Sequence, residues 1–411
     1  RLLPLLALGA RGSIAALNGC TPHSPGPAAR PTTVDRARPA RDTGQPYVAR
    51  PLPRPTRSVW VARMHYRYPE DVTTIMRNCA ALGVDTVLWQ VRGEGTVAYP
   101  SAIEPWAAEF DHQDPGWDPL ALAVTEAHRH GLRIEAWVNV MPGWKGRKPP
   151  PDARQLHHSH PDWFLHDARG QRQPLGDFDV ILNPCLPEVR AHITSVCEEI
   201  VTRYAVDGLH LDYVRYAWDT TPQAAQRYPR DRRTLELYRR ETGQAPDDDK
   251  AAWDRWRAAA ITRLVRDIRT MLVARRPDAT LTAAVWQDPG RGLRDYLQDG
   301  ATWLRDGLLD AAMPMAYTDD VNVLTRNIAA CRAAAPGGRI VPGIGLYKLD
   351  TADGLRAQLA QCAAWGGDMA LFSYDSLHAT AGDRRRVPLP PEVTAARTLR
   401  RSVLGEFVPA R

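Results

Sequence analysis

The residues best suited to chemistry lie in the segment 207–212, which reads Asp-Gly-Leu-His-Leu-Asp. Successive side chains of a β-strand point to opposite faces, so His210 and Asp212 would share one face while Leu209 and Leu211 point to the other. A carboxylate at the end of such a strand can act as a nucleophile, or it can stabilise the positive charge that develops on a sugar ring as a glycosidic bond breaks. The alternative is a structural aspartate that hydrogen-bonds to neighbouring strands, and Asp212 could serve either purpose.

Polar side chains share a face in two further strand-like segments. Gln90 and Arg92 alternate with apolar residues in 84–92, and Trp137 and Asn139 do so in 132–139. An arginine in such a position could hold a nearby carboxylate in its ionised form, and an asparagine amide could hydrogen-bond to a sugar hydroxyl. We therefore expect these four residues, together with His210, to bind and orient a substrate around Asp212.

Hydrolysis of a glycosidic bond also needs a carboxyl group that donates a proton to the leaving oxygen. Glu94 follows the strand-like segment 84–92, and Asp288 follows the segment 280–286. Either residue could be this general acid, and either could equally be a solvated loop charge. The sequence leaves the choice open.

Tryptophan is unusually frequent, since the chain has 13 Trp and only 5 Phe. The flat rings of Trp and Tyr carry a polar edge and suit the apolar faces of sugars, which favours a role in substrate binding. Trp60, in contrast, is expected to pack between strands and helices. The aromatic residues predicted to contact substrate are Trp137, Trp286, Tyr317, Tyr347 and Tyr374.

The elements that would carry these residues alternate between strand and helix from residue 58 onward. Eight segments have the apolar pattern of a strand, and helical periodicity fills most of the connections between them. The two longest connections, 140–186 and 214–250, follow the third and fourth strands, on the side where a barrel enzyme builds its site. No Gly-x-Gly-x-x-Gly follows a strand, which disfavours an open sheet that binds a dinucleotide. The pattern predicts an α/β fold, a (β/α)8 barrel of the TIM type, with strands at 58–63, 84–92, 132–139, 206–213, 280–286, 309–317, 339–347 and 369–374.

The first 57 residues differ in composition from the rest of the chain. Residues 1–20 contain a short apolar run followed by Leu-Asn-Gly-Cys, which is similar to a bacterial lipoprotein signal with Cys20 as the lipidated residue. Residues 21–57 hold nine Pro and seven Arg and are expected to form a disordered tether. We thus expect an exported protein, membrane-anchored or secreted, with a barrel domain at 58–380 and a C-terminal extension at 381–411.

Charge and cysteine usage exclude several classes of protein. Residues 1–57 carry a net charge of +7 and the remaining chain −1, so the folded part lacks the basic face of a nucleic-acid binder. The six cysteines form no Cys-x-x-Cys pair, and His157, His158 and His160 have no acidic or Cys partner at ligand spacing. We therefore expect neither a metal nor a cofactor. No run of about 18 apolar residues predicts a membrane-spanning helix.

Four motifs taken in order resemble a known family. They are Gln90-Val91-Arg92, Ala136-Trp137-Val138-Asn139, His160-Pro161-Asp162-Trp163 and the segment 207–212. Together they resemble the glycosyl-hydrolase-like family ten of bacterial envelope lipoproteins, over roughly residues 57–375. The resemblance implies a TIM-type barrel, retention in the cell envelope and hydrolysis of a glycan such as peptide-free peptidoglycan. A more distant similarity to the α-amylase superfamily implies that Asp212 is the nucleophile.

The sequence as a whole predicts a glycoside hydrolase that acts on an envelope or extracellular polysaccharide. Its partners would be that polysaccharide and, if Cys20 is modified, a membrane surface; no nucleic acid and no obligate protein partner is expected. One alternative is a catalytically silent carbohydrate-binding lipoprotein that uses the same cleft. Another is a glycan transferase, whose products would include longer oligosaccharides.

Overall fold

The computed structural model describes residues 48–216, 228–386 and 388–407. The predicted leader, with Cys20, and most of the predicted tether lie outside these residues. The last part of the tether is described, and it contacts the barrel. The backbone N–H groups of Arg50 and Thr56 donate to the carboxylates of Asp207 and Asp368, each at 2.7 Å. The barrel thus already holds the chain at residues 50 and 56, before residue 58, the predicted start of the domain.

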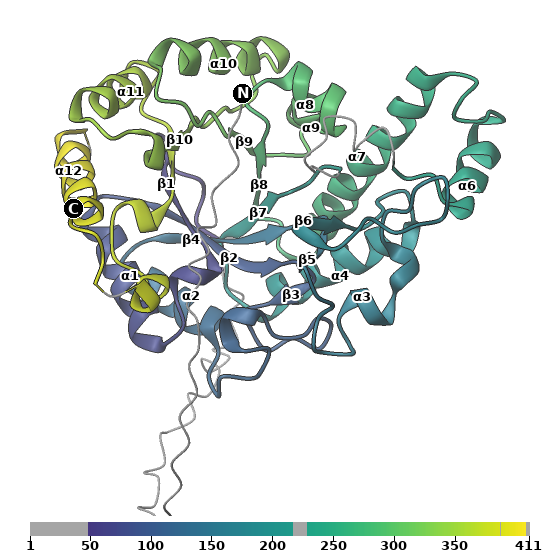
Figure 1. The fold of residues 1–411 in the computed structure, drawn as a ribbon. Helices are drawn as coiled ribbons and strands as arrows, with labels where there is room; N and C mark the ends of the chain where they lie inside the picture. Colours follow the sequence, from purple (N-terminus) through teal and green to yellow (C-terminus); the bar gives the residue numbers. More distant parts are fainter. Residues whose placement is uncertain (1–47, 217–227, 387, 408–411) are drawn as a thin grey trace, which may run out of the picture. The chain divides into compact units, whose positions relative to one another are not determined.

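Within the described residues, eight parallel strands form a nearly closed barrel, which confirms the predicted fold (Figure 1). Neighbouring strands follow the order β10-β11-β1-β2-β4-β7-β8-β9. The two ends of this order, β9 and β10, are joined by single bridges from Ala312 to Ile340 and from Met315 to Gly343. The strands are β1 (Arg57–Val61), β2 (Thr86–Gly93), β4 (Arg133–Asn139), β7 (Gly208–Asp212), β8 (Thr280–Val285), β9 (Ala311–Pro314), β10 (Gly343–Gly345) and β11 (Met369–Phe372).

Helices between the strands cover the outside of the barrel, as the periodicity predicted (Figure 1). Several begin at an aspartate whose side chain accepts a backbone N–H of the first turn, for example Asp118 and Asp249. The helices are α1 (Pro69–Ala81), α2 (Pro119–Arg129), α3 (Leu156–Ser159), α4 (Pro187–Arg203), α6 (Arg232–Thr242), α7 (Lys250–Arg275), α8 (Pro289–Tyr296), α9 (Gly300–Arg305), α10 (Val321–Ala334), α11 (Ala352–Ala364) and α12 (Pro391–Phe407).

The two long connections contain structure that the sequence did not reveal. After β4 the chain forms an antiparallel hairpin of β5 (Pro142–Gly146) and β6 (Gly176–Ile181). Helix α6 lies in the connection after β7, and the short strand β3 (Thr96–Val97) pairs with β2. In the C-terminal extension, α12 packs against α11, and Arg356 forms an ion pair with Glu406 at 2.8 Å.

The core has two parts, one on each side of the barrel wall. Leu209 and Leu211 point outward into the larger apolar cluster shared with the helices, as predicted. Trp60 was predicted to pack there too, but it lies inside the barrel. The reason is strand alternation, since its neighbours Val59 and Val61 on β1 take the outward positions. The interior cluster consists of Trp60, Leu88, Trp137, Ala311, Met313, Val341 and Ala370.

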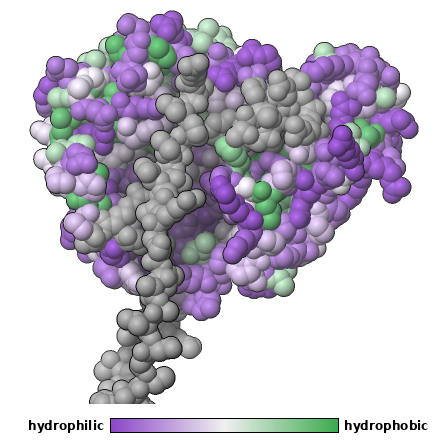
Figure 2. Space-filling model, in the orientation of Figure 1, coloured by the Kyte–Doolittle hydropathy of each residue, from purple (hydrophilic) through white to green (hydrophobic). Residues whose placement is uncertain are grey.

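None of the helices in the described part of the chain combines the length and apolar character needed to cross a membrane. The face of the molecule in Figure 2 is mostly hydrophilic, and its hydrophobic residues are scattered or in small groups.

Candidate active site

Asp212 is the last residue of β7 and lies at the C-terminal mouth of the barrel, beside Asn139 at the end of β4. Its side chain is almost fully buried, and the residue is only 6% exposed. One carboxylate oxygen accepts the backbone N–H of Tyr213 at 2.6 Å and lies 3.5 Å from a guanidinium nitrogen of Arg215. Burial raises the pKa of Asp212, while Arg215, the Tyr213 N–H and the Trp137 indole lower it. The structure therefore places a buried carboxylate with one cationic partner where the sequence predicted it.

Aromatic rings form one wall of the mouth. Tyr317 stacks on Phe372, with ring centroids 5.0 Å apart, and meets Tyr347 edge-on at 6.1 Å. Burial, and to a lesser extent the negative charge of Asp212, raise the pKa of the Tyr317 phenol well above its usual value. Tyr347 is 40% exposed and forms the open side of the wall. Tyr317 and Tyr347 were predicted to meet substrate, whereas Phe372 was not recognised.

Two polar atoms at the mouth lack hydrogen-bond partners among the described residues. They are Oδ1 of Asn139 and the indole nitrogen of Trp137, and both are buried. The Trp137 indole lies close enough to Asp212 to lower its pKa, but without the geometry of a full hydrogen bond. Because buried polar atoms are nearly always paired, these two atoms could bind the hydroxyl groups of a ligand.

His210 lies below Asp212, where its ring contacts other strands of the barrel and does not reach the mouth surface. Its ring is fully buried, with Nε2 accepting the indole N–H of Trp60 at 2.9 Å and Nδ1 at 2.9 Å from the Thr282 hydroxyl. Burial lowers the pKa of His210 to about 3, so the ring is neutral. Gln90 is also buried, and its Oε1 accepts the backbone N–H of Arg63 at 3.0 Å. Both residues support the floor of the barrel mouth.

Glu94 follows β2 directly and has a left-handed backbone (φ 50°), and its carboxylate is ion-paired with Arg63. The Gln155 side-chain amide donates to the carbonyl oxygens of Glu94 at 2.9 Å and of Gly143 at 2.5 Å. Gln155 therefore ties the Glu94 turn to strand β5 of the hairpin. A Cβ on Gly95 would lie 2.7 Å from the Gln155 nitrogen, so this close approach requires glycine.

Asp179, on strand β6 of the hairpin, was missed by the sequence analysis. It is half-buried and lies opposite Lys145 in the hairpin register. Burial and the negative charge of Glu94 raise the pKa of Asp179 to about 6, although Lys145 and Arg215 act to lower it. The available signal was the alternation in Gly-Asp-Phe-Asp-Val-Ile, which is typical of a strand with one polar face.

Tyr213 and Arg215 connect these carboxylates into one cluster. Burial raises the pKa of the Tyr213 phenol, and Asp179, Asp212 and Glu94 raise it further. Arg215 stacks on the Tyr213 ring at 4.2 Å and lowers the pKa of both Asp212 and Asp179. We call Asp212, Asp179, Glu94, Tyr213 and Arg215 the mouth cluster.

Arg92 lies outside the mouth cluster, contrary to the prediction. The register of β2 against β4 shifts between Gln90 and Arg92, so the alternation of faces breaks there. Arg92 is fully buried on the side of α4, where it binds both carboxylate oxygens of Glu104, at 2.8 and 2.7 Å. His192 of α4 contacts the same carboxylate at 2.9 Å. Arg92 does hold a carboxylate in its ionised form, but in a structural ion pair.

Asp288 and Tyr374 also lie away from the mouth cluster. Asp288 is exposed and caps α8, with its carboxylate accepting the N–H of Arg291 at 3.0 Å. A helix cap explains its type and position without catalysis. Strand β11 ends at Phe372, and Tyr374 beyond it is fully buried, where its hydroxyl accepts the side-chain N–H of Asn78 at 2.8 Å. Neither placement fits the role that the sequence suggested.

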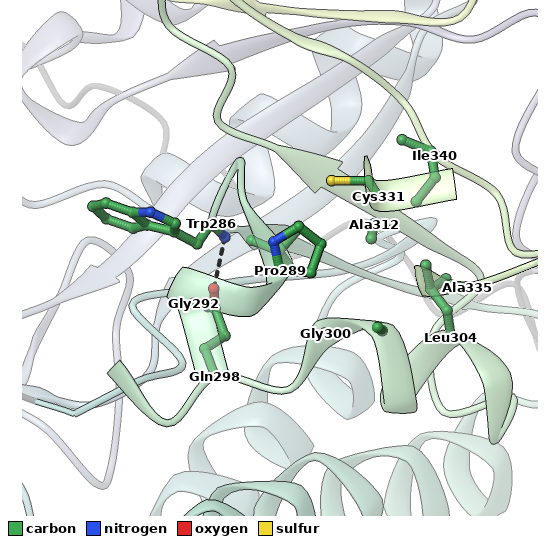
Figure 3. A pocket seen from close by; sticks show the side chains of 12 residues that line it. Trp286, Pro289, Gly292, Gln298, Gly300, Leu304, Ala312, Cys331, Ala335 and Ile340 are labelled. Carbon is green, nitrogen blue, oxygen red and sulfur yellow. Dashed lines mark hydrogen bonds between the residues drawn. The ribbon is translucent and has the colours of Figure 1, made fainter. Parts of the chain in front are cut away.

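Trp286 follows β8 and packs on Tyr296, with centroids 4.3 Å apart, while its backbone N–H donates to Gln298 at 2.7 Å (Figure 3). It borders an apolar cavity lined by residues such as Leu304 and Cys331. This cavity holds about 20 Å³, which is room for about one water molecule and not for a sugar. The indole ring itself points away from it (Figure 3).

No group of three or more His, Cys, Asp or Glu side chains in the described part of the chain could hold a metal ion. Of the three clustered histidines, His157 contacts Arg172 at 2.6 Å, and burial lowers its pKa to about 4. The mouth cluster itself offers three carboxyl groups, one phenol and one guanidinium.

A parallel eight-stranded barrel with carboxylates and aromatic rings at the C-terminal ends of its strands is the architecture of the TIM-barrel enzymes. Within this class, residues 55–347 match the family described as Glycosyl hydrolase-like 10. The chain belongs to this family, as the sequence motifs suggested.

Relatives with matching sequences are named as glycosyl hydrolases. The chain is 29% identical over 263 residues to Glycosyl hydrolase DigH of Escherichia coli K12, covering 57% of this chain and 55% of that protein. It is 26% identical over 299 residues to Glycosyl hydrolase YngK of Bacillus subtilis 168, covering 64% and 54%. The chain thus spans about half the length of the curated relatives it matches.

Solved structures with the same fold include glycosidases. The glycoside hydrolase domain of PgaB (BpsB) from Bordetella bronchiseptica matches with a TM-score of 0.57 and 15% identity, covering 84% of this chain and 99% of that domain. An α-L-fucosidase from Paenibacillus thiaminolyticus matches with a TM-score of 0.57 and 15% identity, covering 84% and 48%. At this level of identity the similarity shows the fold.

Proposed function

We propose that the protein is a glycoside hydrolase and that Asp212 is its nucleophile or charge-stabilising carboxylate. The observation that carries the proposal is the buried Asp212 carboxylate at the end of β7, with Arg215 as its cationic partner at 3.5 Å. A carboxylate in this position can stabilise or attack the anomeric carbon as its positive charge develops. Membership of the glycosyl-hydrolase-like family supports the same chemistry.

The remaining residues of the mouth provide substrate binding. The rings of Tyr317, Phe372 and Tyr347 offer apolar faces for a sugar, and the exposed edge of Tyr347 lies where a chain would enter. The unpaired atoms of Asn139 and Trp137 can bind its hydroxyl groups. The proposed substrate is an envelope polysaccharide, in the first instance the peptide-free glycan strand of peptidoglycan that the family resemblance implies.

The experiment incubates the purified protein with peptide-stripped peptidoglycan strands and, separately, with α- and β-glucans, and identifies products by mass. Wild type should release short oligosaccharides from one of them. Asp212→Asn should lose at least about 10³-fold in rate, because the reacting carboxylate is removed, while it still binds the glycan. Asp288→Asn is the matched control, since asparagine also caps a helix, and it should keep wild-type activity.

The outcomes separate this proposal from its rivals. A wild-type protein that binds glycan but yields no product on any of these substrates would instead be a carbohydrate-binding protein. Oligosaccharides longer than the starting material would indicate a transferase. Equal loss of activity in Asp288→Asn would contradict the assignment of the site to the mouth cluster.

The proposal includes retention in the cell envelope through a lipid on Cys20. The support is the sequence alone, Leu-Asn-Gly-Cys after a short apolar run. Mass spectrometry of the N-terminal peptide from the protein expressed in a bacterial host should show a diacylglyceryl group on Cys20, and Cys20→Ser should release the protein from membranes. An unmodified cysteine would leave a secreted hydrolase.

A further inference from the structure

We propose that Asp179 is the proton donor of this site, and that its carboxyl group protonates the leaving glycosidic oxygen. The inference rests on the proposed hydrolase function and assigns the residue that the sequence left open between Glu94 and Asp288. Two structural features carry it, namely the docking of the hairpin on the barrel mouth and the pairing of the three carboxylates. The charges around Asp179 agree with both.

The hairpin that carries Asp179 is fixed to the barrel mouth. The backbone N–H of Met141, just before β5, donates to the carbonyl oxygen of Tyr213 at 3.3 Å, and that of Leu182, just after β6, donates to Met141 at 2.9 Å. At the other side Gln155 joins Gly143 to the Glu94 turn. A Cβ on Gly143 would lie 2.4 Å from the Phe164 ring, so the hairpin packs tightly here as well. Asp179 is therefore positioned by the scaffold and not by a free loop.

Pairing distinguishes the three carboxylates of the mouth cluster. Asp212 has Arg215 and the Tyr213 N–H, and Glu94 has Arg63. Among the residues that the structure describes, the Asp179 carboxylate forms no ion pair within 4 Å and accepts no side-chain hydrogen bond. A carboxyl group without such a partner can take up and release a proton without breaking a salt bridge, which suits a general acid.

Charged and titratable groups from β2, β5 and the segment after β7 act on Asp179, and they include the Tyr213 phenol. Glu94 at the end of β2 favours the protonated form, whereas Lys145 on β5 and Arg215 after β7 favour the ionised form. Together with burial they raise its pKa to about 6. This value keeps a large share of Asp179 protonated in mildly acidic solution. Burial raises the pKa of Asp212 as well, but Asp212 has the Arg215 guanidinium at 3.5 Å and the Tyr213 N–H at 2.6 Å as partners for its ionised form. The two carboxyl groups thus divide into an acid and a nucleophile or stabiliser.

The chemical step balances with these two groups and water. The Asp179 proton moves to the glycosidic oxygen as the bond from the anomeric carbon to that oxygen breaks, and the electron pair stays on the oxygen. Asp212 attacks or stabilises the anomeric carbon meanwhile. The Asp179 carboxylate then removes a proton from the water molecule that attacks the same carbon, which restores both side chains.

The experiment measures the pH dependence of the rate on the peptide-stripped glycan strands, or on whichever glucan wild type cleaves. The variants are Asp179→Asn, Asp179→Glu and Glu94→Gln. Asp177→Asn is the matched control, because Asp177 lies on the same strand but is exposed and ion-paired with Arg147. Wild type should lose activity as the pH rises above about 6.

Asp179→Asn should be about 10²–10⁴-fold slower and should lose the alkaline limb of the profile, because the proton donor is gone. Asp179→Glu should restore part of the rate together with that limb. Glu94→Gln should move the limb to lower pH, since a negative charge beside Asp179 is removed. Asp177→Asn should match wild type.

A rate for Asp179→Asn within about threefold of wild type, or a reduced rate with the alkaline limb unchanged, would overturn the inference. If Asp179→Asn does not fold, the Glu94→Gln profile decides, and a limb that does not move overturns it. Cleavage by wild type but not by Asp212→Asn shows that the hydrolase proposal stands whatever Asp179 does. Absence of any product from wild type overturns both.

Discussion

Among the described residues, two of the regions in which arginine meets buried carboxylates differ in how completely the carboxylates are paired. Behind β2, Arg92 binds both oxygens of Glu104, and His192 binds one of them; we call these three residues the brace. In the mouth cluster, Arg215 touches one oxygen of Asp212 at 3.5 Å, and Asp179 has no ion pair within 4 Å among the described residues.

The pKa values follow this difference. In the brace, burial would raise the pKa of Glu104, but Arg92 and His192 lower it to about 2. In the mouth cluster, burial dominates, and the pKa values of Asp212 and Asp179 are both raised. A fully paired carboxylate stabilises the fold and stays ionised, whereas an under-paired one costs stability and remains available for chemistry.

The largest expected effect comes from removing the arginine of the brace. Arg92→Met leaves the Glu104 charge buried without its main partner and should lower the free energy of unfolding by about 3–5 kcal/mol. Arg92 also donates to the carbonyl oxygens of Asn139 and Val140, so the rate of the molecules that remain folded should fall by less than about tenfold, far less than in Asp212→Asn. Urea denaturation and a rate normalised to folded protein measure the two quantities.

The double variant Arg92→Met, Glu104→Leu is the control, because it removes the unpaired charge and should recover much of the lost stability. Loss of activity without loss of stability in Arg92→Met would return Arg92 to the substrate site that the sequence suggested. It would also mean that the brace, like the mouth cluster, takes part in the reaction.

Strand alternation in the sequence predicted the position of Asp212 in the mouth cluster correctly but the position of Arg92 in the brace wrongly. Alternation along β7 correctly placed His210 and Asp212 inside the barrel, because β4 and β7 pair residue by residue from Glu135–Gly208 to Asn139–Asp212. The same rule failed for Arg92, since the register shift after Gln90 moves it to the other face. Such a shift depends on the neighbouring strand and leaves no mark in the apolar pattern.

Asp179 shows a second limit. The fold required only the strand and helix pattern, which is local, and the eight strands were found from it. Asp179 reaches the site only because the hairpin docks on the mouth through Gln155, Gly143 and the Glu94 turn, all distant in sequence. A long connection gives no periodic signal for such docking. The sequence therefore predicted Asp212 and Glu94 at the barrel mouth but did not predict Asp179 beside them.

The second prediction concerns the acid side of the stability profile. The pKa of Glu104 is lowered to about 2 in the folded protein, so its ionised form stabilises the fold above about pH 4.5, and this contribution is lost as the pH falls from there toward 2. The loss should be on the order of 2–3 kcal/mol. Free energies of unfolding at pH 7, 5, 4 and 3 should fall in wild type and fall less in Glu104→Gln.

Glu406 provides the comparison for this measurement, because it also pairs with an arginine, Arg356, but in solvent. Glu406→Gln should keep the acid slope of wild type, since solvent and salt screen an exposed pair. A slope that flattens as much in Glu406→Gln as in Glu104→Gln would mean that exposed carboxylates dominate acid unfolding.

The smallest expected change in the free energy of unfolding comes from Asp179 in the mouth cluster, and here the substitution should stabilise the fold. The pKa of Asp179 is raised to about 6, so its protonated form is favoured by folding, and the fold loses stability as the pH rises through 6. Asp179→Asn removes this cost and should be more stable than wild type at pH 8, by on the order of 1 kcal/mol, but not at pH 4. Because exposed Asp177 pairs with Arg147, Asp177→Asn should show no such gain at pH 8. If Asp179→Asn were instead less stable than wild type at pH 8, the carboxylate would have a partner that stabilises its charge, and the mouth cluster would be paired as fully as the brace.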